Sequence, residues 1–144
     1  MPKLTRKLPS TIIAKAIKLM GPNGEHWNNH NLHHRRLDGQ DTYCALGALS
    51  MAAYDNVCYP HDVIDEHLTF TETPTDGYIE AATIVAKVAD SRFTTGDDVP
   101  TWNDDQEEGP KGYKKIKSVF CKALKIALKK EEAKARKKAS KNVK

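Results

Sequence analysis

The sequence DTYCALGALSMAAYD occupies residues 41–55 and predicts a helix from Thr42 to about Asp55. Most of its side chains are small, and Gly47 falls inside the helix, where glycine costs about 1 kcal/mol relative to alanine. A packing reason for this glycine is therefore expected, because small side chains allow another helix to approach closely. We expect this helix to form the centre of the core.

Helical spacing of apolar residues predicts four more helices around this one. They are residues 10–20, capped by Ser10; a short helix opened by Pro60, with Val63, Ile64 and Leu68 facing inward; a helix from Thr73-Pro74-Thr75-Asp76 to about Ser91; and a last helix over about 112–128. Two long polar loops, 21–43 and 92–110, lie between them. No alternating strand pattern of useful length occurs, so any sheet would be a short ribbon within the loops.

The expected fold is therefore all-α. It is a small single-domain bundle of four to five helices over residues 1–128, with residues 1–9 loosely ordered. Beyond Leu128 no large apolar residue occurs until Val143, so residues 129–144 cannot contribute to the core. We expect them to form a basic extension that is either helical or disordered.

Length and composition exclude several classes of protein. The chain has 144 residues, about the length of one domain. It has no run of about 18 apolar residues, which predicts no membrane span, and residues 1–10 lack the apolar stretch of a signal peptide. Its three cysteines are too widely spaced for a disulfide framework or a CxxC zinc site. We therefore expect a cytoplasmic protein without a cofactor.

Charge is distributed unevenly along the chain. The formal net charge of +4 combines +6 over residues 1–36, −14 over 37–110 and +12 over 111–144. The basic end can neutralise the acidic middle, remain solvated, or bind an acidic partner. Because lysine dominates the last block, binding to nucleic acid would be salt-sensitive and independent of base sequence. The candidate binding residues are Arg35, Arg36, Lys129, Lys130, Lys134, Arg136, Lys137 and Lys138.

Two motifs stand in a fixed order along the chain. C-A-L-G-A-L occupies residues 44–49, and Pro100-Thr101-Trp102-Asn103-Asp104 follows before the last helix. Together they resemble an uncharacterised domain family found in bacteriophage and bacterial genomes, over roughly residues 10–128. The resemblance implies a small helical fold and a phage or mobile-element setting, and it implies no reaction. It singles out, in a structural role, Trp27, Cys44, Gly47, Trp102, Asn103 and Asp104.

Cys44 is the best candidate for a catalytic residue. A helix N-terminus lowers the pKa of a thiol, and Gln40, four residues earlier, could donate to an oxyanion while a histidine acts as base. Against this hypothesis, no sheet is predicted that would bring a histidine to the thiol, and cysteine is among the most buried residue types. Beside Ala45 and Ala48, a packing role for Cys44 is preferred.

The segment His26-x3-His30-x2-His33-His34 has spacings at which two histidines on a helix could share a zinc ion. The asparagines between them are poor helix formers, so a polar loop without a metal is preferred. Asn103-Asp104-Asp105 and Glu107-Glu108 could similarly bind a hard cation, although no D-x-D-x-D-G loop is present. A simpler role for Asn103 and Asp104 is to satisfy backbone donors beside a buried Trp102.

These observations favour a non-enzymatic interaction protein of phage or mobile-element type that binds a host or viral macromolecule, with a protein partner favoured. The acidic segment 90–110 would suit a basic partner surface. One alternative is a nucleic-acid-binding protein that uses the basic tail without regard to base sequence. A second alternative is a hydrolase that depends on Cys44.

Overall fold

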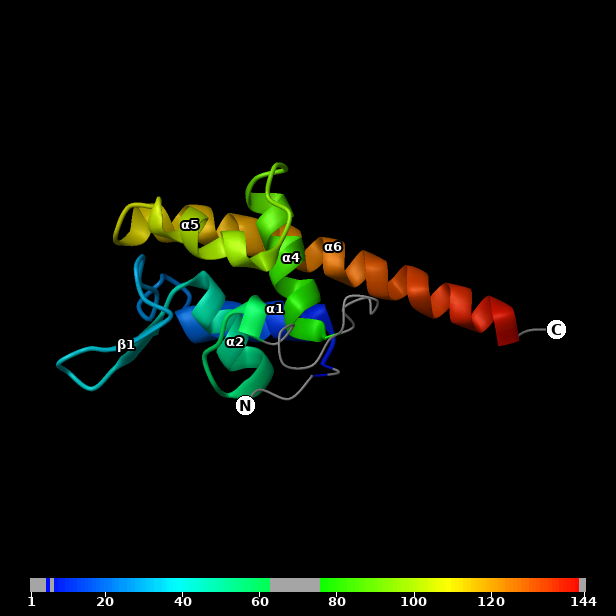
Figure 1. Cartoon of the computed structure of the whole chain (residues 1–144), viewed down its shortest axis with the longest axis horizontal. Helices are drawn as coiled ribbons and strands as arrows, with labels where there is room; N and C mark the ends of the chain where they lie inside the picture. Colours follow the sequence, from blue (N-terminus) through cyan, green and yellow to red (C-terminus); the bar gives the residue numbers. More distant parts are fainter. Residues whose placement is uncertain (1–4, 6, 63–75, 143–144) are drawn as a thin grey trace.

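The computed structural model describes residues 5, 7–62 and 76–142, which are mostly helical with one small sheet (Figure 1). The elements are α1 (Pro9–Met20), β1 (His33–Arg35), β2 (Asp41–Tyr43), α2 (Ala45–Tyr54), α4 (Gly77–Ala89), the 3-10 helix η1 (Gly96–Asp98), α5 (Val99–Asp104) and α6 (Pro110–Asn142). Residues 60–62 are also helical. The predicted inward-facing Val63, Ile64 and Leu68, and the predicted start at Thr73, lie outside the described residues.

Helix α2 is almost entirely buried, as the small side chains of residues 45–53 predict. Every residue from Ala45 to Ser50 is buried, as are Ala52 and Ala53. Both α1 and α4 pack against α2 and also against α6, whereas α2 and α6 hardly touch each other. The core is therefore built on α1 and α4, with α2 and α6 as their two partners.

The helix starts differ from the predicted ones. Helix α1 begins at Pro9, with Leu8 as N-cap, because the fixed φ of proline suits the first helical position. Ser10 is therefore not the cap, and its hydroxyl instead donates to Glu131 Oε1 at 2.7 Å. Helix α2 begins three residues later than predicted, because residues 41–43 form a strand and Cys44 is the N-cap.

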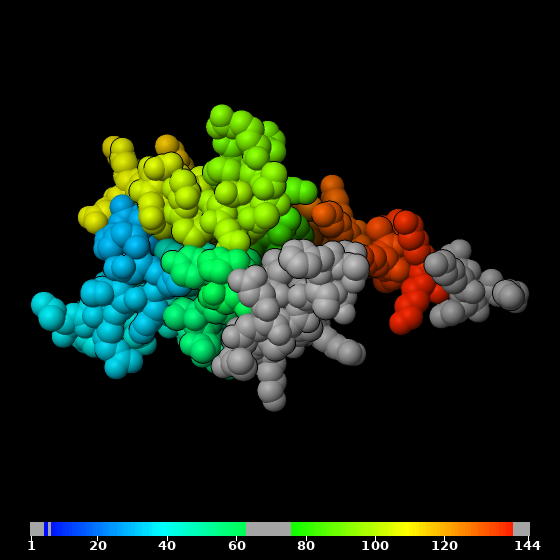
Figure 2. Space-filling model, in the orientation of Figure 1, coloured from blue at the N-terminus to red at the C-terminus, as the bar shows by residue number. Residues whose placement is uncertain are grey.

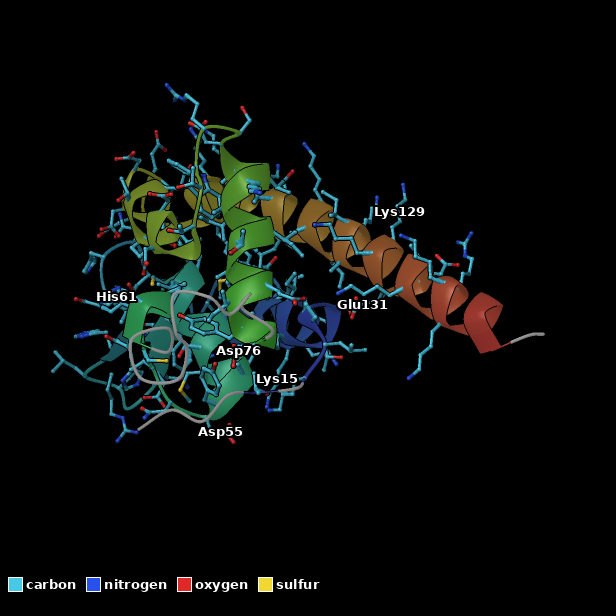
Figure 3. The ribbon with its side chains drawn as sticks, turned by 45° about the vertical axis from the view of Figure 1, so that its right-hand side comes forward. Lys15, Asp55, His61, Asp76, Lys129 and Glu131 are labelled. Carbon is cyan, nitrogen blue, oxygen red and sulfur yellow. The ribbon has the colours of Figure 1, made fainter. Side chains whose placement is uncertain are left out.

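Asp76 ties three segments together at the start of α4. Its carboxylate is buried and accepts hydrogen bonds from the backbone N–H groups of Thr5, Tyr78 and Ile79 and from the Tyr54 hydroxyl. Burial, followed by this bond to Asp76, raises the pKa of Tyr54. Through Asp76 the N-terminal segment, the end of α2 and the start of α4 share one anchor, labelled in Figure 3.

The two predicted loops contain more regular structure than expected. Within residues 21–43, β1 and β2 pair antiparallel, with His34 opposite Thr42, which is the short ribbon that the sequence allowed. Residues 92–110 were expected to be a loop, and this is wrong for residues 96–104, which form η1 and α5. A capping box between Thr95 and Asp98 starts this helical segment, and Pro100 occupies its early turn.

Helix α6 does not end near Leu128. It continues to Asn142, giving 33 residues and a length of about 50 Å. Its buried stripe consists of Tyr113, Ile116, Phe120, Ala123 and Ala127. Beyond the stripe the helix extends past the other elements (Figure 1), and Ala, Lys, Glu and Arg all favour helix there. None of the described helices is long and apolar enough to cross a membrane.

Gly47 is required by a close approach of the backbone. A Cβ at this position would overlap the carbonyl oxygen of Leu32, so the neighbour that needs the small residue is a loop and not the helix we expected. In an open helix, Gly→Ala would stabilise by about 1 kcal/mol. Here overlap with backbone reverses the sign, because overpacking typically costs about 1–3 kcal/mol.

We therefore predict that Gly47→Ala lowers the free energy of unfolding by about 1–2 kcal/mol. Urea denaturation followed by far-ultraviolet circular dichroism measures this value. Ser118→Ala, at an exposed position of α6, is the control and should be neutral or slightly stabilising. A stabilised Gly47→Ala variant would show that the loop can move away without loss.

Candidate functional site

The motif residues meet at the buried side chain of Asn103 in α5. Asn103 Oδ1 accepts hydrogen bonds from the indole N–H of Trp27 and from the backbone N–H of Ala45, each at 2.9 Å. Its Nδ2 donates to the carbonyl oxygen of Asn28 at 3.2 Å. One side chain thus joins the loop after α1, the first turn of α2 and α5.

This junction explains the two sequence motifs in structural terms. Asn103 is 0% exposed and satisfies a backbone donor, as predicted. Trp102 is only half-buried, so the expected burial of its indole is wrong; the buried indole at this junction is that of Trp27. Asp104 is exposed. Both acceptor positions of Asn103 Oδ1 are used within the protein, which leaves the amide oxygen no capacity to bind a ligand.

Cys44 does not have the properties of a nucleophile. The residue is 3% exposed, and its Sγ accepts the N–H of Gly47 at 3.4 Å. Burial raises the pKa of the thiol to about 11, which outweighs the hydrogen bonds from the helix N-terminus. The expected lowering of this pKa is therefore wrong. Gln40 is exposed in the turn between β1 and β2, where its N–H donates to Asp38.

Three of the four candidate histidines make polar ring contacts, two of them with different atoms of Asp41. The ring of His26 bonds the carbonyl oxygen of Asp41, that of His30 bonds Asn29, and that of His33 bonds the Asp41 carboxylate. His34 follows His33 on the same strand, and consecutive strand residues point to opposite faces. Within residues 5, 7–62 and 76–142, no group of three or more His, Cys, Asp or Glu is placed to hold a metal ion.

Arg35 and Arg36 are separated from the lysines of the tail. Arg35 pairs with Asp41 at 3.1 Å, and Arg36 pairs with Asp38 at 2.6 Å. Both lie on the β1–β2 hairpin, at the end of the molecule opposite the C-terminal half of α6 (Figure 1). The eight predicted binding residues therefore do not form one patch.

A line of basic side chains runs along the solvent side of α6. Residues three, four and seven positions apart share a helix face, and Lys115, Lys122, Lys129 and Arg136 follow at steps of seven. This face lies opposite the buried stripe, and all its basic residues are exposed. We call it the basic ridge; its members are Lys111, Lys114, Lys115, Lys122, Lys125, Lys129 and Arg136.

The basic ridge is long, and acidic residues lie beside its first turns, where Asp105 and Glu107 line one hollow with Lys111, Lys114 and Lys115. From Lys111 to Arg136 it spans about 38 Å at 1.5 Å per residue. In the described part of α6, its one ion pair is between Arg136 and Glu132 at 3.3 Å. In Figure 3, Lys129 projects away from the body of the protein, whereas Glu131 turns toward α1, where it meets Ser10.

The predicted tail residues divide between two faces. Lys129 and Arg136 belong to the basic ridge, whereas Lys130 and Lys134 line hollows between α6 and α4. Lys137 and Lys138 are exposed on other sides of the extension. The five ridge lysines before Leu128 were not identified as binding residues. The seven-residue spacing of Lys115, Lys122 and Lys129 could have identified them. The predicted set took its lysines only from residues after Leu128.

A family model matches residues 4–111, three quarters of the chain. The chain belongs to DUF6197, a family of unknown function. The matched region contains all three partners of the Asn103 junction and ends in the first turn of α6. Nearly all of the basic ridge therefore lies beyond the matched residues. Neither a curated protein nor a solved structure matches the chain.

The Asn103 junction gives a direct test by mutation. Asn103→Ala removes the acceptor of two buried N–H groups, and an unsatisfied buried donor costs about 1–3 kcal/mol. We predict a loss of about 2–4 kcal/mol in the free energy of unfolding, measured in urea. Asp104→Ala, the exposed neighbour, should change it by less than about 0.5 kcal/mol. Equal effects of the two substitutions would contradict a specific role for Asn103.

Thiol reactivity tests the environment of Cys44. In the native Cys121→Ala variant, which lacks the exposed thiol, we predict no rapid labelling by iodoacetamide near pH 8, and labelling of Cys44 and Cys58 after denaturation. The thiol pKa of Cys44 is 9.0 in the unfolded chain and about 11 in the folded one. As the pH rises, the unfolded chain therefore loses this proton at a lower pH than the folded chain. Stability should therefore fall as pH rises from about 9 toward 11, and Cys44→Ala should reduce this fall. Fast native labelling of Cys44 would restore the catalytic hypothesis.

Proposed function

We propose that the protein is a non-enzymatic interaction protein that binds nucleic acid along the basic ridge of α6, without regard to base sequence. The observation that carries this proposal is the set of seven exposed cationic side chains on one face of a continuous helix. The buried, hydrogen-bonded Cys44 supports the non-enzymatic part. The proposed setting, the cytoplasm of a host cell with a phage or mobile element, rests on the resemblance of the two motifs.

The chemistry of the ridge suits phosphates better than bases. Six of its seven members are lysines, which act as point charges, and base recognition favours the two-pronged arginine side chain. Each phosphate neutralised by a lysine releases condensed counterions, so affinity comes mainly from charge and decreases with salt. The ridge is therefore suited to the backbone of a nucleic acid of any sequence.

The fold supplies rigidity to this surface. Tyr113, Ile116 and Phe120 fix the first half of α6 against the rest of the protein, and the hydroxyl of Tyr113 donates to the carbonyl oxygen of Gly21 at 2.6 Å. Lysines on a fixed helix lose less conformational freedom on binding than lysines on a disordered tail. The ordered ridge should thus bind more tightly than its charge alone would predict.

A charge-matched pair of variants tests the proposal. Lys115→Ala/Lys122→Ala/Lys129→Ala removes three charges from the ridge, and Lys15→Ala/Lys18→Ala/Lys87→Ala removes three exposed charges from α1 and α4. We predict that the ridge variant weakens binding to a labelled duplex by at least about tenfold and reduces the salt slope by about 2–3. The control should change affinity by about twofold or less.

Fluorescence anisotropy at several salt concentrations measures both quantities, and two duplexes of unrelated sequence test sequence independence. Circular dichroism shows whether each variant keeps its helix content. Equal losses from the two triple variants would mean that net charge, and not the ridge, determines binding. Affinity that does not change with salt would exclude binding through the phosphates of the nucleic acid.

A further inference from the structure

A second surface of α6 has a different character from the basic ridge. Helix α4 crosses α6 steeply (Figure 1), and the C-terminal part of α6 extends beyond this crossing (Figure 2). A groove lies between the two helices. The groove has a volume of about 380 Å³ and is lined by Ile84, Val88 and Ile126 together with Thr83, Lys87 and Lys130. A hollow of about 370 Å³ shares Thr83, Ile84 and Lys130 with it and extends to Ile79.

The floor of this groove is apolar and partly open to solvent. Ile126 is 38% exposed and Val88 is half-buried, whereas Ile84 is buried. Ile126 lies off the buried stripe of α6, on the side that faces α4 and the groove. Along α4, the apolar residues from Ile79 to Val88 cover about 14 Å, or two and a half helical turns.

The rim of the groove is cationic. Lys87 comes from α4, and Lys130 and Lys134 come from α6. Among the described lining residues, Glu80 is the one acid. Lys130 follows Lys129 by one position, which places it about 100° around the helix from the ridge. The groove is therefore a separate surface, although it lies on the same helix.

We propose that this groove binds an amphipathic helix of a protein partner, whose apolar face covers Ile84, Val88 and Ile126 and whose acidic flanks pair with Lys87, Lys130 and Lys134. The lysines at the rim favour a partner helix with acidic residues on its flanks. The short apolar floor favours apolar residues at positions i, i+3 or i+4, and i+7 of that helix. A nucleic acid offers no apolar face to cover Ile126, which is 38% exposed. The protein would then have a second partner, distinct from nucleic acid.

The test uses a fluorescein-labelled synthetic peptide of about 18 residues with leucines at that spacing and glutamates on both flanks. A scrambled peptide of the same composition is its control. Fluorescence anisotropy with the full-length protein measures affinity. We expect saturable binding of the amphipathic peptide and affinity at least about tenfold lower for the scrambled one.

Two matched pairs of variants locate the binding site. Lys87→Ala/Lys130→Ala should weaken peptide binding by about tenfold, whereas Lys122→Ala/Lys125→Ala, which removes the same charge from the ridge, should change it by about twofold or less. Ile126→Ser should weaken binding at least about fivefold. Leu128→Ser is its control, because Leu128 is 52% exposed but does not line the groove.

The results separate this inference from nucleic-acid binding. Ile126→Ser should leave duplex affinity unchanged, because it alters no charge, so peptide binding and duplex binding can fail independently. Equal binding of the scrambled peptide, or equal losses from the two lysine pairs, would mean that the peptide binds through net charge alone and would overturn the inference. Absence of saturable binding would overturn it as well. Thermal melts of each variant confirm that the fold is retained.

Discussion

The buried amide of Asn103 is the interaction on which the rest of the fold depends. The loop after α1 has few apolar residues, so burial alone supplies little energy to hold it in place. Instead, Asn103 Oδ1 accepts a hydrogen bond from the indole N–H of Trp27, 76 residues away in sequence, and one from the backbone N–H of Ala45 at the start of α2, 58 residues away. With the loop held there, the Leu32 carbonyl can lie against Gly47, where a larger residue would not fit.

The helices with strong apolar periodicity could be predicted from sequence, and the elements held by polar contacts could not. The buried face of α1 and the small residues of α2 were predicted from their spacing. The β1–β2 hairpin and α5 are short, and their positions depend on contacts such as the one between Asn103 and Ala45. Such contacts join distant segments, and no local pattern indicates which residues will meet.

The candidate site was also predictable only in part. The basic character of the C-terminal region was evident from composition, but composition does not indicate which lysines share a face. Once α6 continues to Asn142, a period of seven aligns Lys115, Lys122 and Lys129 and turns Lys130 toward α4. For Cys44 a packing role was preferred over catalysis, and its burial agrees with packing. Position at a helix start alone would have indicated a lowered thiol pKa, because burial, which raises it, is not visible in the local sequence.

The two proposed binding surfaces lie on one helix, and this has a thermodynamic consequence. Lys129 on the basic ridge and Lys130 in the groove are neighbours, so an acidic partner in the groove lowers the positive potential that a phosphate meets on the ridge. The same reduction must apply to the peptide when nucleic acid binds first, because coupling between two binding free energies is reciprocal. Exposed charges on separate faces are screened within about 8–10 Å, so the coupling should be weak and confined to the end of the ridge nearest the groove. A partner in the groove would then shift nucleic acid toward Lys111–Lys122 without releasing it from the protein.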